Sequence, residues 1–451
     1  MKKNTKIAGS ALVLLGASFL AFVSSGFLSC SSDGGSGSGG GDDLVVDADG
    51  EISASDTPSG YAGTSWSTSA STAVTVSTKR DLVTYAKKGG YIIYVDGMID
   101  MSDGRLPSEG GGTNDSLDDF VNSTTSGAYT TYTAWQSAYA AACSTSTEDG
   151  ESDSSNSSLY DILWTLNDAY KAIIQLNVAK NTTIIGLSSD CGIKGGTISI
   201  SGVSNVVIRN LVVQDAYDPF THHEVKSDGT SDGYNAQFDC VTIQDSCSNI
   251  WLDHCTFEDT MELAYVKTGG STSEKWQTYD GLVDIKGAGK YITVSYCKFQ
   301  NHDKTSLIGS SDSEGSNSTR KITYHHNYFY NCGQRLPMVR NTTLHLYNNF
   351  YSASSPHYTQ QYAVGVRKNS IIYAENNYFD SGIKYSFKNS DGKLYSSGNK
   401  DYSSSGCNST VTGSTLFSSA VNAYTYSADS AANVSALVKA NAGAGVWTVS
   451  K

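Results

Sequence analysis

The chain has 451 residues and a formal net charge of −13, so it is long enough for one large domain or two ordinary ones. A net acidic chain excludes general nucleic-acid binding, which needs a basic surface, although it stays compatible with a local basic cleft. Only 5 prolines beside 44 glycines and 29 tyrosines favour many short strands and turns over a helical bundle.

The first 30 residues have the features of an export signal. Three lysines within the first six residues precede an apolar stretch from 7 to 23, and small residues lead to Cys30. One interpretation is a cleaved secretory signal with an incidental cysteine. The other is a lipoprotein signal, cleaved before Cys30 and acylated on its sulfur, although Phe27 stands where such signals usually carry Leu. We expect export in either case, as a secreted protein or a cell-surface or outer-membrane lipoprotein whose only membrane contact is a lipid on Cys30.

Residues 31–60 are mostly Gly, Ser and Asp, which predicts a flexible acidic tether, and we expect a single domain over 61–451. Thr78 is expected to cap a short helix over 79–86. The apolar run 91–97 ends at a glycine and predicts a buried strand.

Residues 101–157 are poor in apolar side chains and predict a long surface excursion. Apolar residues at helical spacing then predict one amphipathic helix over 159–173. From residue 182 onward, short apolar runs closed by turns predict strands. We expect them at 183–186, 196–200, 206–213, 241–243, 249–253 and 291–294.

An inexact five-residue repeat organises the second half of the chain. Its copies are DHCTF (253–257), SYCKF (295–299), HHNYF (325–329), YNNFY (347–351) and ENNYF (375–379). A fixed unit separated by insertions of variable length is typical of a solenoid. Short strands with aromatic side chains stacked inside and asparagines stacked at the bends predict an all-β parallel β-helix. A β-sandwich would need alternating strands joined by hairpin turns, which are weak here.

Eight cysteines follow Cys30, and they show no CxxC pair or His/Cys cluster typical of zinc. Cys255 and Cys297 occupy the repeat position of Asn327, so we expect either stacked thiols or a disulfide between coils. The repeat fades after about residue 382, and residues 437–445 are expected to pack back on the solenoid.

Three aspartates form a candidate metal site. Asp280 and Asp284 surround the start of a strand, and Asp239 precedes the strand one coil earlier. Adjacent coils lie about 4.8 Å apart, so the three carboxylates can converge, and a hard cation such as Ca²⁺ would offset their repulsion. Taken singly, each is more simply a solvated turn aspartate. We favour the metal site because the three lie beside a set of cations.

The cations are Lys304, Arg335 and Arg340. A lone arginine would normally pair with a neighbouring carboxylate, but three cations on neighbouring coils form a cleft suited to the carboxylate of an acidic sugar. The chain contains no G-x-S-x-G motif of serine esterases and no glycine-rich phosphate loop.

Longer stretches such as IWLDHCTF, HDKTSLIG and QRLPMVR lie in a fixed order between about residues 91 and 380. On these stretches the chain resembles bacterial pectate lyases of polysaccharide lyase family 1. The resemblance implies a right-handed parallel β-helix, here with a few short helices, that acts on polygalacturonate. We expect a monomer. It also implies calcium-dependent β-elimination that leaves 4,5-unsaturated oligogalacturonides. By resemblance, Asp239, Asp280 and Asp284 hold Ca²⁺, Arg335 is the general base, and Lys304 and Arg340 bind the substrate carboxylate.

The implied mechanism is physically coherent. Removal of the C5 proton needs stabilisation of an enolate-like intermediate, which Ca²⁺, Lys304 and Arg340 would supply on the C6 carboxylate. Arginine is an unusual base because a free guanidinium has a pKa of about 12.5 or higher. Nearby positive charge disfavours the protonated form, and we expect activity to rise towards alkaline pH.

Other functions on the same fold remain alternatives. A pectin lyase, which prefers methyl esters, does not need the calcium carboxylates, and a polygalacturonase needs paired acids as acid and base. A catalytically inactive surface glycan-binding β-helix would not need Lys304, Arg335 and Arg340 together. The segment 215–235 is longer and more polar than a minimal coil turn, and 101–157 matches the family poorly.

Overall fold

The structure is a computed structural model that describes residues 50–451, apart from 66–69, 108–113, 144–156, 227–229, 262–267, 270–273, 276, 315–319, 355–357 and 414–422. The predicted signal segment, Cys30 and most of the predicted tether lie outside the described residues.

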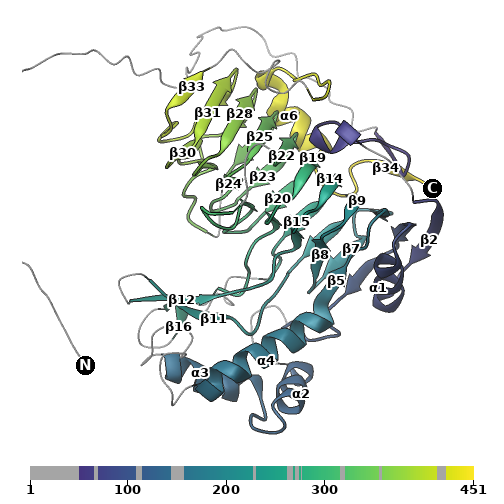
Figure 1. The fold of residues 1–451 in the computed structure, drawn as a ribbon, viewed down its shortest axis with the longest axis vertical. Helices are drawn as coiled ribbons and strands as arrows, with labels where there is room; N and C mark the ends of the chain where they lie inside the picture. The colour runs from purple at the N-terminus through teal and green to yellow at the C-terminus, as the bar shows by residue number, and fades with distance from the viewer. Residues whose placement is uncertain are drawn as a thin grey trace, which may run out of the picture.

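Three parallel sheets form a solenoid, in which each coil contributes one strand to each sheet (Figure 1). The strands of the eleven-stranded sheet are, in spatial order, β2 (Thr72–Val76), β3 (Tyr91–Val95), β6 (Thr182–Gly186), β9 (Ser204–Arg209), β14 (Ser248–Asp253), β19 (Lys290–Ser295), β22 (Lys321–His325), β25 (Thr343–Tyr347), β28 (Ile371–Glu375), β31 (Lys393–Ser397) and β33 (Val411–Gly413).

The nine-stranded sheet runs through β4 (Met98–Asp100), β7 (Gly192–Lys194), β10 (Val212–Gln214), β15 (Thr256–Glu258), β20 (Lys298–Gln300), β23 (Tyr328–Tyr330), β26 (Phe350–Ser352), β29 (Tyr378–Phe379) and β32 (Lys400–Asp401). The eight-stranded sheet runs through β5 (Gln175–Asn177), β8 (Thr197–Ser201), β13 (Val241–Gln244), β18 (Val283–Ile285), β21 (Leu307–Ile308), β24 (Met338–Val339), β27 (Val364–Val366) and β30 (Phe387–Asn389). The predicted all-β parallel β-helix is confirmed.

The five-residue repeat marks the corner between the eleven-stranded and nine-stranded sheets. Its second residue adopts the left-handed backbone conformation, with φ between 49° and 56°. This single residue therefore bends the chain from one sheet into the other. The residues at this position are His254, Tyr296, His326, Asn348 and Asn376. The predicted strand 206–213 is therefore two strands, β9 and β10, because Asn210 (φ 51°) forms the same corner one coil earlier.

The third and fifth residues of the repeat point into the core. Asn349 Oδ1 accepts hydrogen bonds from Asn327 N at 3.0 Å and from Asn327 Nδ2 at 2.9 Å. Asn349 N and Nδ2 in turn donate to Asn377 Oδ1 on the next coil. Ring centroids at the fifth position lie 4.5–5.2 Å apart from coil to coil. At the third position, Cys255 and Cys297 are buried free thiols, which settles the two alternatives in favour of stacked thiols. Burial raises the pKa of the Cys297 thiol.

Helices cover one end and one flank of the solenoid (Figure 1). Thr78 caps α1 (Lys79–Lys88) as predicted, its side chain accepting a hydrogen bond from Asp81 N. The predicted amphipathic helix is α4 (Ser157–Ile174). The other described helices are α2 (Asp115–Thr124), α3 (Tyr132–Cys143), α6 (Ala431–Asn441) and the 3-10 helix η1 (Tyr61–Ser65).

The excursion 101–157 differs from the prediction, because α2 and α3 pack against α4 through their own aromatic core. Trp135 and Tyr139 stack at 5.5 Å, one helical turn apart, and Phe220 packs edge-on to Trp135 at 5.1 Å. The segment folds into helices despite its polar composition, because a few large rings at helical spacing form a packed core. The antiparallel hairpin β11 (His222–Val225) and β12 (Ser231–Asn235) belongs to the polar segment 215–235, and a second small hairpin pairs β16 (Thr268–Gly269) with β17 (Glu274–Lys275).

Both ends of the described chain lie on the solenoid. β1 (Glu51–Ser53) pairs in parallel with β34 (Thr448–Ser450), so residues 50–60 form part of the fold rather than of the predicted tether. Beyond residue 382, the coil continues through β30, β31 and β32 although the sequence repeat fades. α6 packs on Phe350 through Val434 and Val438. None of the helices among the described residues has the length and apolar character to cross a membrane.

Candidate active site

The outer surface of the eight-stranded sheet carries the predicted aspartates. Val283 and Ile285 of β18 point into the core, so Asp284 between them points outward, because side chains alternate along a strand. Asp284 is paired in register with Thr242 of β13, and Asp239 lies just before β13. The strand period of two and the stacking of coils thus bring Asp239 and Asp284 to one place.

Asp239 and Asp284 face the same small space. Asp239 Oδ1 accepts a hydrogen bond from Gly281 N at 3.0 Å, and Thr242 Oγ1 donates to Asp239 Oδ2 at 2.8 Å. A Cβ atom on Gly281 would lie 2.6 Å from Asp284 Oδ1 and 2.7 Å from Asp239 Oδ1. Any residue other than glycine would therefore push the two carboxylates apart.

Lys286 is a member of the site that our sequence analysis missed. Its ammonium lies 2.9 Å from Asp239 Oδ2 and 3.2 Å from Asp284 Oδ2. The signal that identifies it is the spacing of two between Asp284 and Lys286, which places both on one face of a strand. Burial lowers the pKa of the Lys286 ammonium, but the charges of Asp284 and Asp239 outweigh this effect and raise it.

The ionised form of this carboxylate pair is not fully stabilised by Lys286 alone. Burial, reinforced by the charge of Asp239, raises the pKa of Asp284 to about 7. Two nearby buried carboxylates of this kind are the oxygen donors that Ca²⁺ prefers, and the donor set therefore fits the ion that the family resemblance implies.

Asp280 is turned towards Lys304 instead of towards the other two aspartates. Lys304 Nζ lies 2.6 Å from Asp280 Oδ1 and 2.5 Å from Asn235 Oδ1 at the end of β12. Burial opposes ionisation of Asp280, but Lys304 and Lys286 outweigh it and lower its pKa. Within the part of the chain that the structure describes, no three His, Cys, Asp or Glu side chains are grouped as a metal site. Asp239 and Asp284 face each other, and Asp280 contacts Lys304 but lies near enough for its charge to help raise the pKa of Asp284.

Arg335 lies one coil further along the same sheet surface. Gln334 pairs with Lys304 in an isolated parallel bridge, and the Arg335 carbonyl accepts a hydrogen bond from Ser306 N at 2.8 Å. The residue is half-buried, with φ at 60°, a left-handed conformation that is uncommon for a non-glycine residue. Its Nε is buried and has no hydrogen-bond partner among the residues that the structure describes. The guanidinium is near enough to Asp280 to help lower the pKa of that carboxyl group.

Arg340 is held at the edge of the same region. Its Nε lies 3.0 Å from Asp312 Oδ1, and its NH1 donates to the Gly309 carbonyl at 3.2 Å. Burial raises the pKa of the Tyr362 phenol, and the charges of Arg335, Arg367 and Arg340 all act to lower it, so these guanidiniums surround one ring. The predicted cationic set therefore lies on neighbouring coils of a single surface.

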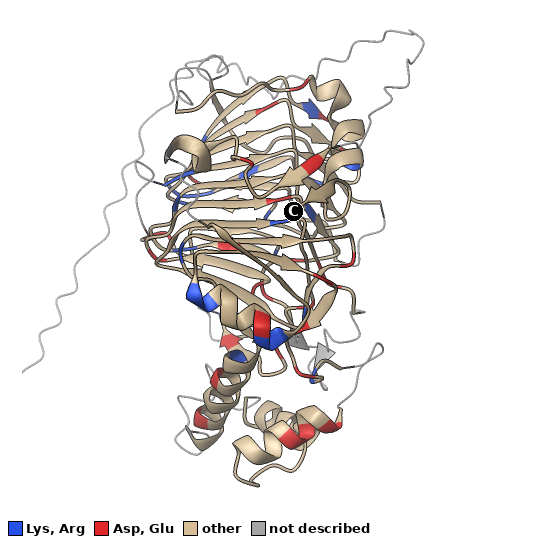
Figure 2. Cartoon of the chain, turned by 90° about the vertical axis from the view of Figure 1, so that its right-hand side faces the viewer, with Lys and Arg blue, Asp and Glu red and all other residues tan. Residues whose placement is uncertain are grey.

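Residues of both charge signs are interspersed along the molecule, and acidic residues also lie on the helices at its end (Figure 2). Along the eight-stranded sheet the charges are ordered. The buried carboxylates of Asp239, just before β13, and Asp284, on β18, are followed by cations on the next coils. The fold and the site define a class of parallel β-helical proteins that carry a row of charged side chains on the outer surface of one sheet.

Comparison with known proteins identifies the family within that class. Residues 137–447 match the model of a family described as pectate lyase. The chain belongs to the pectate lyase family, as the sequence resemblance predicted.

Individual relatives agree with this membership. The chain is 42% identical over 218 residues to a pectate lyase of Bacillus subtilis (strain 168), a match that covers 47% of this chain and 50% of that protein. The chain thus spans about half the length of the curated relatives it matches. A solved pectate lyase bound to a hexasaccharide has a TM-score of 0.65 at 29% identity, covering 86% of this chain and 96% of the other. The pectate lyase from Acidovorax avenae subsp citrulli, with a TM-score of 0.71 at 23% identity over 90% of this chain and 98% of that one, is alike in fold.

Proposed function

We propose that the protein is a pectate lyase that cleaves (1→4)-α-D-galacturonan by β-elimination and leaves 4,5-unsaturated ends. The observation that carries the proposal is the arrangement on the eight-stranded sheet, where the Asp239–Asp284 pair lies beside Lys304, Arg335 and Arg340. The relatives in the same family are pectate lyases by name.

In this mechanism Arg335 takes the C5 proton of a galacturonate unit. The electron pair of the C5–H bond becomes the C4–C5 double bond, and the C4–O bond breaks, leaving an oxygen that takes a proton from water. The Arg335 side chain is only half-buried, so part of the guanidine is exposed for this contact. Lys304 and Arg340 bind the substrate carboxylate, and Lys304 is positioned beforehand by Asp280 and Asn235.

Asp239, Asp284 and Asp280 would hold Ca²⁺. When bound, the ion supplies positive charge that stabilises the charge developing on the substrate carboxylate. Support for this assignment comes from the raised pKa of Asp284 and from Gly281, whose missing side chain leaves room for the two carboxylates to face each other.

The test is the ultraviolet absorbance of unsaturated uronates formed from polygalacturonate. We expect the signal to disappear with a chelator and to return with Ca²⁺. Arg335→Ala should lower the rate by roughly 10²- to 10⁴-fold, the usual contribution of a general base. Arg80→Ala, which changes an exposed arginine on α1, is the matched control and should leave the rate unchanged.

Other outcomes would favour the alternatives. Reducing sugar without the absorbance would indicate a polygalacturonase, and a signal on methylated pectin that withstands chelation would indicate a pectin lyase. No product from either polymer would indicate an inactive glycan-binding β-helix.

We also propose that the protein is exported and lipid-anchored through Cys30. The support is the sequence of the first 30 residues, with its lysines, apolar stretch and small residues before Cys30. Expression with labelled fatty acid should label the wild-type chain and not Cys30→Ala. Label-free wild-type protein in the culture medium would show instead a secreted, unanchored enzyme.

A further inference from the structure

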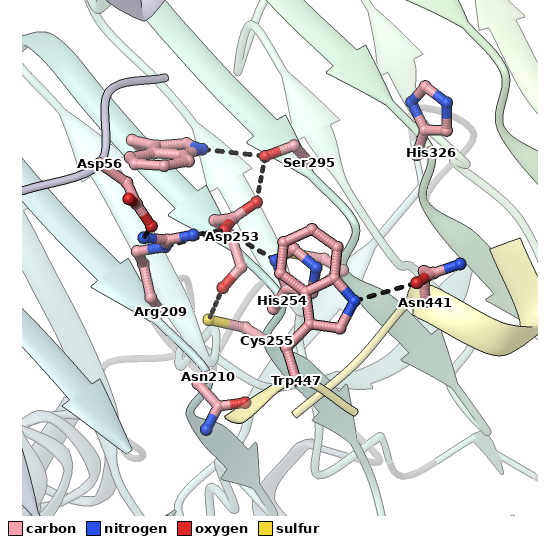
Figure 3. A network of polar contacts seen from close by, with 12 residues as sticks. Asp56, Arg209, Asn210, Asp253, His254, Cys255, Ser295, His326, Asn441 and Trp447 are labelled. Carbon is pink, nitrogen blue, oxygen red and sulfur yellow. Dashed lines mark hydrogen bonds and ion pairs between the residues drawn. The ribbon is translucent and has the colours of Figure 1, made fainter. Parts of the chain in front are cut away.

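A second cavity, with a volume of about 570 Å³, opens on the outer face of the eleven-stranded sheet. Its floor is formed by residues of β14 and β19, and its walls by residues 51–59 and by Trp447, which precedes β34. Figure 3 shows the polar network on its floor. This cavity lies on a different sheet from the candidate active site, and the proposed elimination uses none of its residues.

The floor carries one cation and two carboxylates. Arg209 Nε lies 2.8 Å from Asp253 Oδ2, and Arg209 NH1 lies 2.5 Å from Asp56 Oδ2, so the guanidinium sits between two carboxylates (Figure 3). Its Cζ lies 4.3 Å from the ring centre of Trp251. Trp251 Nε1 donates to Ser295 Oγ, and Ser295 donates to Asp253 Oδ1 at 2.6 Å. The donors of this network are therefore used within the protein.

His254 presents an unused acceptor to the cavity. Its Nδ1 lies 2.7 Å from Asp253 Oδ2, and since a carboxylate only accepts, Nδ1 carries the proton. When the ring is neutral, Nε2 therefore carries a lone pair and can accept a hydrogen bond. The side chain is 1% exposed, and Nε2 has no hydrogen-bond partner among the described residues. A buried polar atom left unpaired is costly, so this nitrogen favours a ligand that donates to it.

Ser59 presents a second acceptor, because a chain of hydrogen bonds fixes the direction of its proton. Asp429 Oδ2 lies 2.8 Å from His326 Nε2, His326 Nδ1 lies 2.9 Å from His325 Nδ1, and His325 Nε2 lies 2.8 Å from Ser59 Oγ. Burial lowers the pKa of both imidazoles and keeps the rings neutral. Starting from the carboxylate, each group accepts from the next, so the Ser59 hydroxyl donates inward to His325. The Tyr347 phenol also hydrogen-bonds this hydroxyl, which leaves one lone pair of the exposed Ser59 oxygen for a ligand.

Flat rings line the cavity beside these acceptors. The centroid of the Trp447 ring lies 4.2 Å from that of His254, and Tyr296 stacks on the other side of His254 at 4.8 Å. Both Tyr296 and Trp447 remain partly exposed. Aromatic faces pack against the C–H faces of sugar rings, while acceptor atoms bind hydroxyl groups. Glu51 and the second carboxylate beside Arg209 give the cavity an excess of negative charge, which disfavours a ligand that is itself an anion.

We propose that this cavity is a non-catalytic binding site for a neutral sugar unit of a glycan chain. Its acceptors require a ligand with several hydroxyl donors, and its carboxylates discriminate against the uronic acids that the other face is built to bind. The protein would then hold neutral glycan with the eleven-stranded sheet while the eight-stranded sheet faces an acidic one. This inference does not depend on the proposed lyase activity.

The experiment uses the full chain and two neutral soluble polymers, a galactan and an arabinan, with polygalacturonate as the anionic comparison. Binding is measured by affinity electrophoresis and calorimetry. Thr57→Trp fills the cavity from its exposed wall, and Thr72→Trp places the same side chain on an exposed position of β2 outside it. We expect a neutral polymer to bind wild type and Thr72→Trp alike, and Thr57→Trp to weaken the affinity by at least about tenfold. Ser59→Ala should weaken it less, because it removes one acceptor and no volume.

The proposal fails if neither neutral polymer binds wild type at millimolar sugar, or if Thr57→Trp binds as tightly as Thr72→Trp. It also fails if Thr57→Trp loses polygalacturonate binding instead. Cleavage of polygalacturonate by wild type, measured in parallel, reports on the eight-stranded sheet alone and separates failure of this inference from failure of the proposed function.

Discussion

The core of the solenoid and the outer surface of its eight-stranded sheet use the stacked coils in opposite ways. In the core, each coil repeats the same neutral group, so that Asn327, Asn349 and Asn377 satisfy one another. On the outer surface, successive coils carry different charged groups, and Asp239 and Asp284 of neighbouring coils are like charges. Repetition stabilises the fold, because each of these asparagines finds a partner one coil away. On the outer surface this repetition is interrupted, and like charges come together that a bound ligand would stabilise.

The largest effect that tests this comparison is expected from Asp239→Asn. The substitution keeps the size of the side chain and removes one charge from the carboxylate pair. We expect Ca²⁺ affinity to fall by about a hundredfold or more, with little change in thermal stability measured in chelator. Calorimetric titration with Ca²⁺ gives the affinity. Asp245→Asn, an exposed aspartate in the turn after β13, is the matched control. Equal Ca²⁺ affinity of the two variants would contradict the assignment of Asp239.

The converse effect is expected in the core, from Asn349→Leu. Asn349 Nδ2 donates to the carbonyl of Tyr324 at 3.0 Å and to Asn377 Oδ1 at 3.0 Å, and the side chain is fully buried. Leucine would leave these acceptors and the donors of Asn327 unsatisfied, so the free energy of unfolding should fall by roughly 3 kcal/mol. Denaturant unfolding measures it.

Asn408→Leu makes the same change at an exposed asparagine and should cost far less. The folded fraction of Asn349→Leu should keep its affinity for Ca²⁺. A loss of that affinity without a loss of stability would show that core and surface are not separable in this way.

A smaller effect is expected from Asp218, which sharpens the comparison because it is a buried carboxylate with neutral partners. It accepts hydrogen bonds from Asn167 Nδ2 at 3.2 Å and from the backbone N–H groups of Phe220 and Gln237 at 2.9 Å. Burial raises the pKa of Asp218 from 3.8 to about 7. Asp280, with Lys304 beside it, shifts the other way.

The folded state therefore keeps the Asp218 proton to a higher pH than the unfolded state does. Between about pH 4 and pH 7 the folded chain binds more protons, so this group's contribution to the free energy of unfolding falls as pH rises, by up to roughly 1.4 kcal/mol per pH unit. Denaturant unfolding across this range should show a steeper decline for wild type than for Asp218→Asn. Parallel pH profiles of the two proteins would refute the assignment.

Most of the fold could be predicted because successive coils of the solenoid repeat the same short sequence unit. The five-residue repeat encodes a left-handed corner, an inward polar or thiol group and a stacked ring, and each of these lies where the repeat placed it. The helices α2 and α3 could not be predicted from composition, because their stability comes from packing against α4 and Phe220. The pairing of β1 with β34 joins segments almost 400 residues apart, so no local sequence pattern predicts it.

The candidate site was predictable only in part. The identities of Asp239, Asp284, Lys304, Arg335 and Arg340 follow from motifs and their order along the coils. Their partners do not, because the sequence leaves open which charge of one coil meets which charge of the next. The placement of Lys286 between two aspartates, and the turn of Asp280 towards Lys304 and Asn235, appear only in the structure.

By itself, then, the sequence determined the stacked coils, the family and the set of ionisable groups on one sheet, since these depend on short-range spacing. Only the tertiary structure decided how those groups pair and that a second, acceptor-lined cavity forms on the eleven-stranded sheet. The reason is that both depend on side chains brought together across coils and from the two ends of the chain, at distances that local spacing does not specify.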